Sequence, residues 1–308
     1  ILIGNMITHS YFGLNAVLRS AGHPRTAMYC TFLTIILNTI LDPLFIFTFK
    51  WGIEGAAWAT ILSQAVSLGV QLKLFSRKSE LLHLRRGIYK LRADIVRQTL
   101  AIGLSPFLVN SCSCLVVLIC NNRLLQFGGD MAIGAYGIVN RVLFFFITIV
   151  IGLIQGMQPI VSYNYGAKRS DRVRKALMLT MFWATLVTTV GFAVCVGCPE
   201  LVARIFTSEP QLIERSSWAM RVMCMFMPVI GFQLVTTNFF QSIGKVNKSI
   251  FLSLTRQVLL LIPLLLILPL FIGEKGVWYS MPISDMIAAM LTIVMLWIQF
   301  REWKNEKM

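Results

Sequence analysis

One acidic side chain lies inside a stretch of the sequence that is otherwise almost wholly apolar. Asp42 follows Asn38 by four residues and directly precedes Pro43. In a helix this spacing puts Asn38 and Asp42 on one face, where they could hold a proton or a cation jointly. Pro43 has no N–H, which frees the carbonyl of Thr39 and favours a bend beside the carboxylate. Because an ionisable group is costly at membrane depth, Asp42 is a functional candidate; the alternative is a polar cap near the end of its segment.

A second polar run lies at the end of another apolar stretch. It contains Gln155, Gln158 and Tyr163, with Pro159 between the last two. Lipid cannot satisfy the hydrogen-bonding groups of these side chains, so other parts of the protein or water must do so. Two interpretations stay open: the side chains line a water-filled cavity, or they fold the end of the helix into the basic loop that follows.

Four further charged residues lie within or beside apolar stretches, namely Arg141, Arg221, Arg256 and Asp285. Arg256 and Asp285 fall in consecutive segments, where they either form an ion pair or lie at different depths. Long arginine side chains also reach the membrane interface by snorkelling. We expect structural roles for all four.

The sequence contains no pattern that points to an enzyme or to a resident metal. There is no HExxH motif and no Ser, His and Asp set, and His9, His23 and His83 are scattered. Seven cysteines lie mostly in apolar stretches, without a histidine at metal-ligand spacing. We therefore expect no catalytic residue, no dedicated metal site and no cofactor.

The composition defines the elements that must carry these residues. Of the 308 residues, 56% are hydrophobic and only 13% are charged, whereas a soluble chain has about a quarter charged residues. The mean hydropathy is +0.73. The net charge of +15 is spread between apolar runs rather than gathered in one patch, which argues against a nucleic-acid partner. The expected partner is the lipid bilayer.

Cutting the chain at its charged residues, glycines and prolines leaves nine apolar segments of about 20 residues or more, the length that a membrane helix needs. This predicts an all-α polytopic membrane protein. Ile1 is neither an initiator Met nor the start of a signal peptide, so we expect the chain to open within a helix of a longer protein. The nine segments are 1–20, 26–49, 52–75, 98–120, 131–154, 176–197, 217–242, 249–272 and 277–300.

Lysine and arginine alternate between the loops that join these segments. Since basic residues accumulate in cytoplasmic loops, the alternation predicts a protein of the cytoplasmic (inner or plasma) membrane with a cytoplasmic C-terminus. The basic loops are 19–25, 73–97, 168–175, 245–248 and 301–307.

The sequence also contains an internal repeat with a shift of about 221 to 222 residues. Gly22 and Gly244 lie in corresponding basic loops, and the pair Gly52 and Gly55 corresponds to Gly273 and Gly276. Segments one to three therefore match segments seven to nine in the same orientation, as in parallel transporter repeats. We expect twelve helices in two six-helix lobes, with residues 1–90 forming the rest of the N-lobe and a basic connector, and residues 91–308 forming the C-lobe.

Four sequence motifs resemble those of the multidrug and toxic compound extrusion (MATE) family, and the resemblance runs along essentially the whole chain. It implies twelve helices in two lobes and a monomeric antiporter that exports organic, often cationic, compounds in exchange for H⁺ or Na⁺. The motifs are Asn15-Ala-Val-Leu-Arg19-x-x-Gly22, Asn38-x-x-x-Asp42-Pro43, Gly52-x-x-Gly55-Ala-Ala-x-Ala-Thr60 and Gln155-Gly-x-Gln158-Pro159-x-x-x-Tyr163-Asn-Tyr-Gly-Ala167.

The resemblance further implies a cation-coupling site formed by Asn15, Asn38, Asp42 and Thr60, with Na⁺ as one candidate at Asp42. One physical difficulty accompanies this set. At 1.5 Å of rise per residue, Asn15 lies about 10 Å from the turn at Gly22, whereas Asn38 lies about 18 Å beyond Thr26. Asn15 belongs to the site only if helix tilt closes this gap.

Two other functions compete with drug and cation antiport. The first alternative is a lipid-linked oligosaccharide flippase, a relative with a similar helix plan and a larger, more charged cavity. The second is a membrane-embedded transferase or protease, which would need a catalytic constellation that the sequence lacks.

Overall fold

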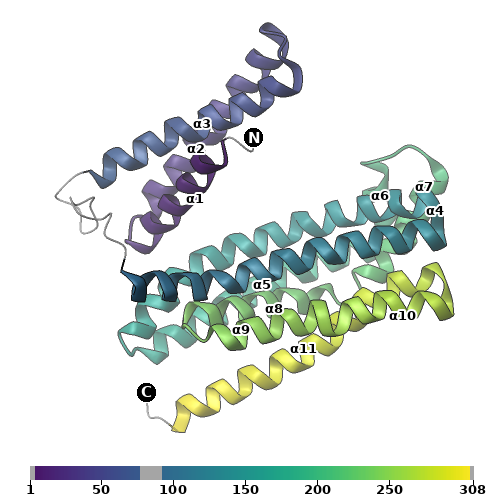
Figure 1. Ribbon diagram of the computed structural model, residues 1–308. Coiled ribbons are helices and arrows are strands. Elements are labelled where there is room, and N and C mark those ends of the chain that lie inside the picture. The colour runs from purple at the N-terminus through teal and green to yellow at the C-terminus, as the bar shows by residue number, and fades with distance from the viewer. Residues whose placement is uncertain (1–3, 77–91, 306–308) are drawn as a thin grey trace. The chain divides into compact units, whose positions relative to one another are not determined.

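The computed structural model describes residues 4–76 and 92–305, and within these ranges all regular structure is helical (Figure 1). The predicted all-α fold is confirmed. The chain separates into two compact units, residues 1–92 (unit 1) and residues 93–308 (unit 2). This division falls two residues after the predicted one. The predicted connector lies largely outside the described residues.

Unit 1 contains three helical segments that pack against one another. They are α1 (Asn5–Ser20), α2 (Pro24–Pro43), which continues into the π-helical turn η1 (Leu44–Thr48), and α3 (Gly52–Phe75). Pro24 occupies the first turn of α2, where its missing N–H has no intrahelical partner to lose. The turns on either side of α2 are made at Gly22 and Gly52, whose φ angles are +88° and +56°, a region that glycine enters at little cost.

Unit 2 contains longer helices with distinct bends. The first, α4 (Ala93–Gly166), consists of two arms that meet at Gly129, whose φ of 69° and ψ of −169° are not helical. The helices α7 (Pro210–Met223) and α8 (Met227–Ser242) form one span bent by 53°. The others are α5 (Ser170–Gly197), α6 (Pro199–Arg204), α9 (Val246–Leu254), the π-helical η2 (Thr255–Leu261), α10 (Ile262–Ile272) and α11 (Glu274–Asn305).

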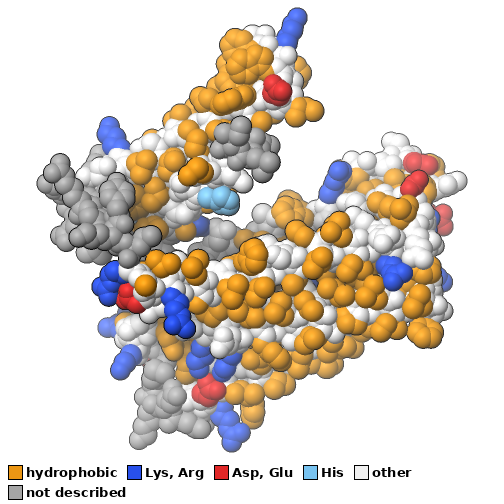
Figure 2. Space-filling view, in the orientation of Figure 1, with side chains coloured by type: hydrophobic (Ala, Val, Ile, Leu, Met, Phe, Trp, Pro, Cys, Tyr) orange, Lys and Arg blue, Asp and Glu red, His pale blue; other side chains and the backbone are white. Residues whose placement is uncertain are grey.

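Each of the nine predicted segments overlaps one or more of these helices. Among the described residues, five helices are long and apolar enough to cross a membrane, or six if α7 and α8 count as one span. The outer surface of unit 2 is apolar: Phe182 is 63% exposed and Phe271 is 81% exposed, and hydrophobic side chains cover the face seen in Figure 2. A surface of this kind needs lipid around it, which makes the chain a multi-pass membrane protein.

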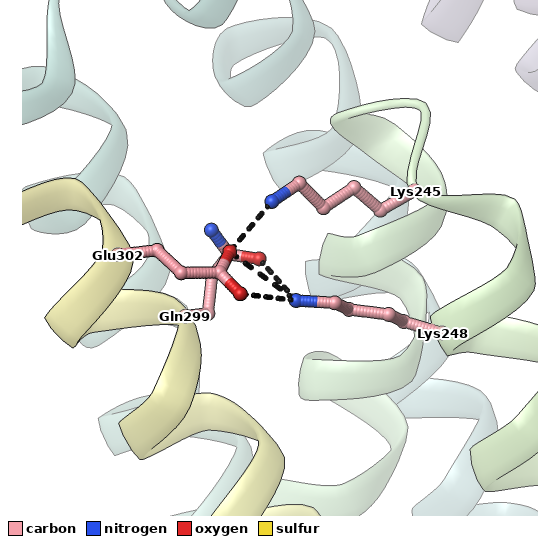
Figure 3. A network of polar contacts seen from close by, with 4 residues as sticks. All are labelled: Lys245, Lys248, Gln299 and Glu302. Carbon is pink, nitrogen blue, oxygen red and sulfur yellow. Dashed lines mark hydrogen bonds and ion pairs between the residues drawn. The ribbon is translucent and has the colours of Figure 1, made fainter. Parts of the chain in front are cut away.

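At one end of unit 2, three of the predicted basic loops come together. Lys245, which directly precedes α9, and Lys248, in the first turn of α9, bind the carboxylate of Glu302 at 2.9 and 3.3 Å. Lys248 also donates to Gln299 (Figure 3). Arg174, which belongs to the third basic loop, lies over the ring of Phe300. Residues far apart in the sequence therefore form one basic end, as the charge alternation predicts for unit 2.

At the opposite end of unit 2, Arg215 connects two helices. Its guanidinium pairs with Glu274 at the start of α11 and donates a 3.0 Å bond to the carbonyl of Gly128 beside the α4 bend. These two contacts tie the start of α11 and the bend of α4 to one guanidinium. The loops that the sequence places away from the basic side thus meet here.

Paired glycines have the same backbone roles in the two copies of the repeat. Gly244 and Gly273 have φ of 75° and 60°, as their counterparts Gly22 and Gly52 also have positive φ. A Cβ on Gly55 would lie 2.9 Å from the backbone of Phe45, and one on Gly276 would lie 2.5 Å from that of Leu268. In both copies a glycine near the start of the last helix therefore lets it approach the preceding helix closely.

Candidate functional site

The carboxylate of Asp42 and the amide of Asn38 meet on one face of α2. Nδ2 of Asn38 donates to Oδ1 of Asp42 at 3.1 Å, as the spacing of four residues predicts. The same nitrogen lies 3.5 Å from Oγ1 of Thr60 on α3. Three of the four residues of the predicted coupling site are therefore adjacent, and they come from two helices.

No basic side chain compensates Asp42 in the part of the chain that the structure describes: none of its lysines and arginines pairs with this carboxylate. Asp42 is only half-buried within unit 1, and its described polar partner is an amide. A carboxylate without a basic partner in an apolar helix is a candidate binding group for a coupling ion, because an unpaired charge is costly at membrane depth.

The backbone next to Asp42 is the weakest part of its span. Pro43 is inside the helix and cannot donate to the carbonyl of Thr39. Directly after it the helix widens to the π-helical η1, in which the N–H of Phe49 bonds to the carbonyl of Leu44 at 3.0 Å. Such π-helical turns are frequent at functional positions. The predicted weak point is present, and it takes the form of a widened turn.

Asn15 does not join this group. Its Nδ2 donates to the carbonyl of Ala27 at 3.0 Å and lies 3.4 Å from the hydroxyl of Thr31, near the opposite end of α2 from Asp42. From Ala27 to Asn38 the rise along the helix is about 16 Å. Tilt does not close the gap noted from the sequence, so the group around Asp42 excludes Asn15.

A row of polar side chains that the sequence analysis did not single out extends from Thr60 along α3. Gln64 accepts a 2.6 Å bond from Thr8 of α1, and Ser67 accepts a 2.7 Å bond from Thr34 of α2. Gln71 is fully buried, and neither atom of its amide has a partner among the described residues. The signal was the spacing Thr60, Gln64, Ser67 and Gln71, which follows one helical face.

The polar run of α4 lies elsewhere. The helix continues through it to Gly166, so the run does not fold the helix into the loop. Gln155 and Tyr163 are exposed, and Gln158 donates to Asn238 of α8 at 3.4 Å. None of the three lines the cavity of unit 2 described below, and their role as cavity residues stays a prediction.

Arg256 of η2 and Asp285 of α11 form an ion pair, with Nε and Oδ1 2.6 Å apart. The two residues therefore lie at one depth. Asp285 is buried, and the ion pair offsets part of the cost of burying its carboxylate.

Within the described ranges, no group of three or more His, Cys, Asp or Glu side chains could hold a metal ion. The oxygen atoms of Asp42, Asn38 and Thr60 are nevertheless of the hard type that an alkali cation prefers over nitrogen or sulfur. Together, the helices and this site define a multi-pass membrane protein with a titratable group inside one of its spans.

Comparison with known proteins identifies the class further. A model of the MatE family matches residues 101–267, and the chain belongs to this family. Multidrug export protein MepA of Staphylococcus haemolyticus is 25% identical over 287 residues, which cover 93% of this chain and 63% of that protein. The chain thus spans less than two thirds of the length of the curated relatives it matches. These relatives are named as exporters, not as enzymes.

Two solved structures extend the likeness to the fold. The MATE multidrug transporter DinF-BH, solved as a complex, is 36% identical, with a TM-score of 0.87, over 96% of this chain and 67% of that one. A MATE crystal structure in complex with MaL6 has a TM-score of 0.89 at 24% identity, over 100% of this chain and 69% of that one. The second comparison shows the fold alone.

Proposed function

We propose that this chain acts as part of an antiporter that exports organic, often cationic, drug-like compounds in exchange for H⁺ or Na⁺. The observation that carries the proposal is Asp42, a carboxylate in an apolar helix that has an amide partner and, among the described residues, no basic one. Membership of the MATE family supports the export of drug-like compounds. The multidrug exporters among its relatives favour this function over a lipid-linked oligosaccharide flippase.

Charge neutralisation at Asp42 would be the coupling step. The ionised carboxylate accepts a bond from Asn38, whereas a protonated carboxyl is itself a donor and no longer needs that bond. Because Pro43 weakens the adjoining turn, a change in this bond can alter the shape of the span at low cost. Ion binding at Asp42 and the geometry of α2 would then be linked, as alternating access requires.

A sodium ion would use the same group differently. It would need several oxygen ligands, and Asp42, Asn38 and Thr60 each have one or two in their side chains. The proton needs the carboxylate alone. The hydroxyl of Thr60 is therefore a ligand for a sodium ion but is not needed to bind a proton.

We propose that the protein lies in the cytoplasmic membrane, with the basic end of unit 2 and the C-terminus on the cytoplasmic side. The support is the excess of lysine and arginine at that end.

The test is efflux of a fluorescent cationic dye from proteoliposomes that contain the protein, with a proton gradient and a sodium gradient imposed separately. Dye movement against its own gradient under one of the two ions is the expected result. Equal dye movement with and without both gradients would contradict coupled antiport.

A further inference from the structure

Unit 2 contains a cavity of about 580 Å³ with a mixed lining. Its walls come from both arms of α4, from α7 and α8, from η2 and from α11. A volume of this size suits a drug-sized molecule. Most of the lining is apolar, with Phe144, Ile147 and Met281 among its members, so the body of a ligand that fits here is apolar or aromatic.

The charged residues of the lining are two arginines and one carboxylate, Arg141, Arg256 and Asp285. The formal charge of the lining is therefore +1. Asp285 is already engaged, because Nε of Arg256 lies 2.6 Å from its Oδ1. The cavity thus has no free carboxylate in its lining with which to bind a cation.

Arg141 is the charge that the fold leaves without compensation. It projects from the second arm of α4, where its neighbours along the helix are apolar except for Asn140, and no described carboxylate pairs with it. A guanidinium at membrane depth usually faces a cavity and binds a partner there. Its planar donors match a carboxylate or sulfonate in a bidentate geometry.

Arg256 is the second arginine of the lining, and part of its guanidinium is available to bind an anion. Its bond to Asp285 uses Nε, and no described residue accepts a bond from its two terminal amino groups. It lies on η2, a π-helical segment that directly precedes α10, in whose first turn Pro263 lies. Next to it, Gln257 donates to Ser113 of α4 at 2.9 Å, which fixes this part of the wall.

We propose that the cavity of unit 2 binds amphipathic organic anions, compounds with an aromatic or apolar body and one carboxylate or sulfonate group. Arg141 is the principal contact of the anionic group, Arg256 is the second, and Asp285 positions Arg256. This ligand class is separate from the organic cations of the proposed antiport. The site lies within unit 2 and does not depend on Asp42 as a coupling residue.

The test measures binding of two dyes that share a xanthene frame, anionic fluorescein and a cationic rhodamine ester, to the purified chain in nanodiscs of neutral phosphatidylcholine. Fluorescence anisotropy in mildly alkaline buffer reports each affinity. Saturable fluorescein binding by the unaltered chain is expected. The variant Arg141→Gln should bind fluorescein roughly tenfold to a hundredfold more weakly, the effect of one charged hydrogen-bonding contact, with binding of the rhodamine ester unchanged or tighter.

Two further variants sharpen the result. Arg141→Glu reverses the charge and should abolish fluorescein binding while strengthening that of the rhodamine ester. Arg221→Gln is the matched control, since Arg221 is also an exposed arginine in unit 2 but is not part of this lining, and it should change neither affinity. Failure of the unaltered chain to bind fluorescein, an unchanged affinity in Arg141→Gln, or an equal loss of both dyes in that variant would each overturn the proposal.

Discussion

The side-chain amide of Asn38 donates a 3.1 Å hydrogen bond to the carboxylate of Asp42 one turn further along α2. The next residue is Pro43, after which the α-helix gives way to a π-helical turn. A titratable group and a weak point of the helix are thus adjacent in a single span.

The first prediction concerns Pro43. Pro43→Ala restores an N–H to the carbonyl of Thr39, so unit 1 should become more stable, by up to about 3 kcal/mol. Dye export should slow, because the span no longer bends easily beside Asp42. Thermal unfolding and efflux from proteoliposomes measure the two effects. The control is Pro24→Ala in the first turn of α2, where proline is already well tolerated; a stabilised Pro43→Ala protein with unchanged export would refute the role of the bend.

The second prediction separates the two coupling ions. Thr60→Val keeps the shape of the side chain and removes its hydroxyl, one of the oxygens available to a metal cation. Sodium-driven export should fall roughly tenfold, whereas proton-driven export should stay nearly unchanged. The control is Thr39→Val. Both hydroxyls donate to a carbonyl of their own helix, Thr39 to Ile35 and Thr60 to Ala56, but only that of Thr60 also lies beside Asn38. An equal fall under both gradients would show that Thr60 acts through the fold.

The third prediction concerns Gln71, whose buried amide has no partner among the described residues. Gln71→Leu removes two unsatisfied polar atoms at similar volume and should stabilise unit 1 by about 1 to 3 kcal/mol. Gln64→Leu is the comparison. Gln64 accepts a bond from Thr8, so removing its amide should not stabilise unit 1. Denaturation of both variants in the same detergent gives the answer, and a less stable Gln71→Leu protein would point to a partner that this account lacks.

The fourth prediction concerns close helix packing in unit 1. A Cβ on Gly55 would lie 2.9 Å from backbone atoms of Phe45, whereas one on Gly69 of the same helix would meet nothing within 4 Å. Gly55→Ala should therefore destabilise by about 1 to 3 kcal/mol, and Gly69→Ala should be neutral or stabilise by up to about 1 kcal/mol. Equal unfolding temperatures for the two variants would contradict this packing.

Much of the helix plan was readable from the sequence because charged residues, glycines and prolines end the apolar runs. The segment 52–75 was predicted with the bounds that α3 has. Where a charged residue does not end a helix, the prediction differs from the structure: the predicted segment 98–120 stops before Arg123, but α4 continues to the bend at Gly129. The single segment 217–242 likewise proved to be two helices bent by 53°.

The candidate site likewise shows that contacts within one helix are predictable from the sequence, whereas contacts between helices are not. The contact between Asn38 and Asp42 lies within one helix, so spacing alone predicted it. Contacts between helices depend on the register of one helix against another, which spacing does not specify. For that reason the sequence does not show that Asn15 lies far from Asp42 along α2, nor that Nε of Arg256 and Oδ1 of Asp285 are 2.6 Å apart.

The most direct measurement of the central claim is gradient-driven dye export by Asp42→Asn, which keeps the size of the side chain and removes its titratable charge. The account predicts that the variant folds and still binds dye, but that export against a dye gradient falls to the level of protein-free liposomes under either ion. Export at the rate of the unaltered protein, at equal reconstituted amounts, would remove Asp42 from the coupling mechanism.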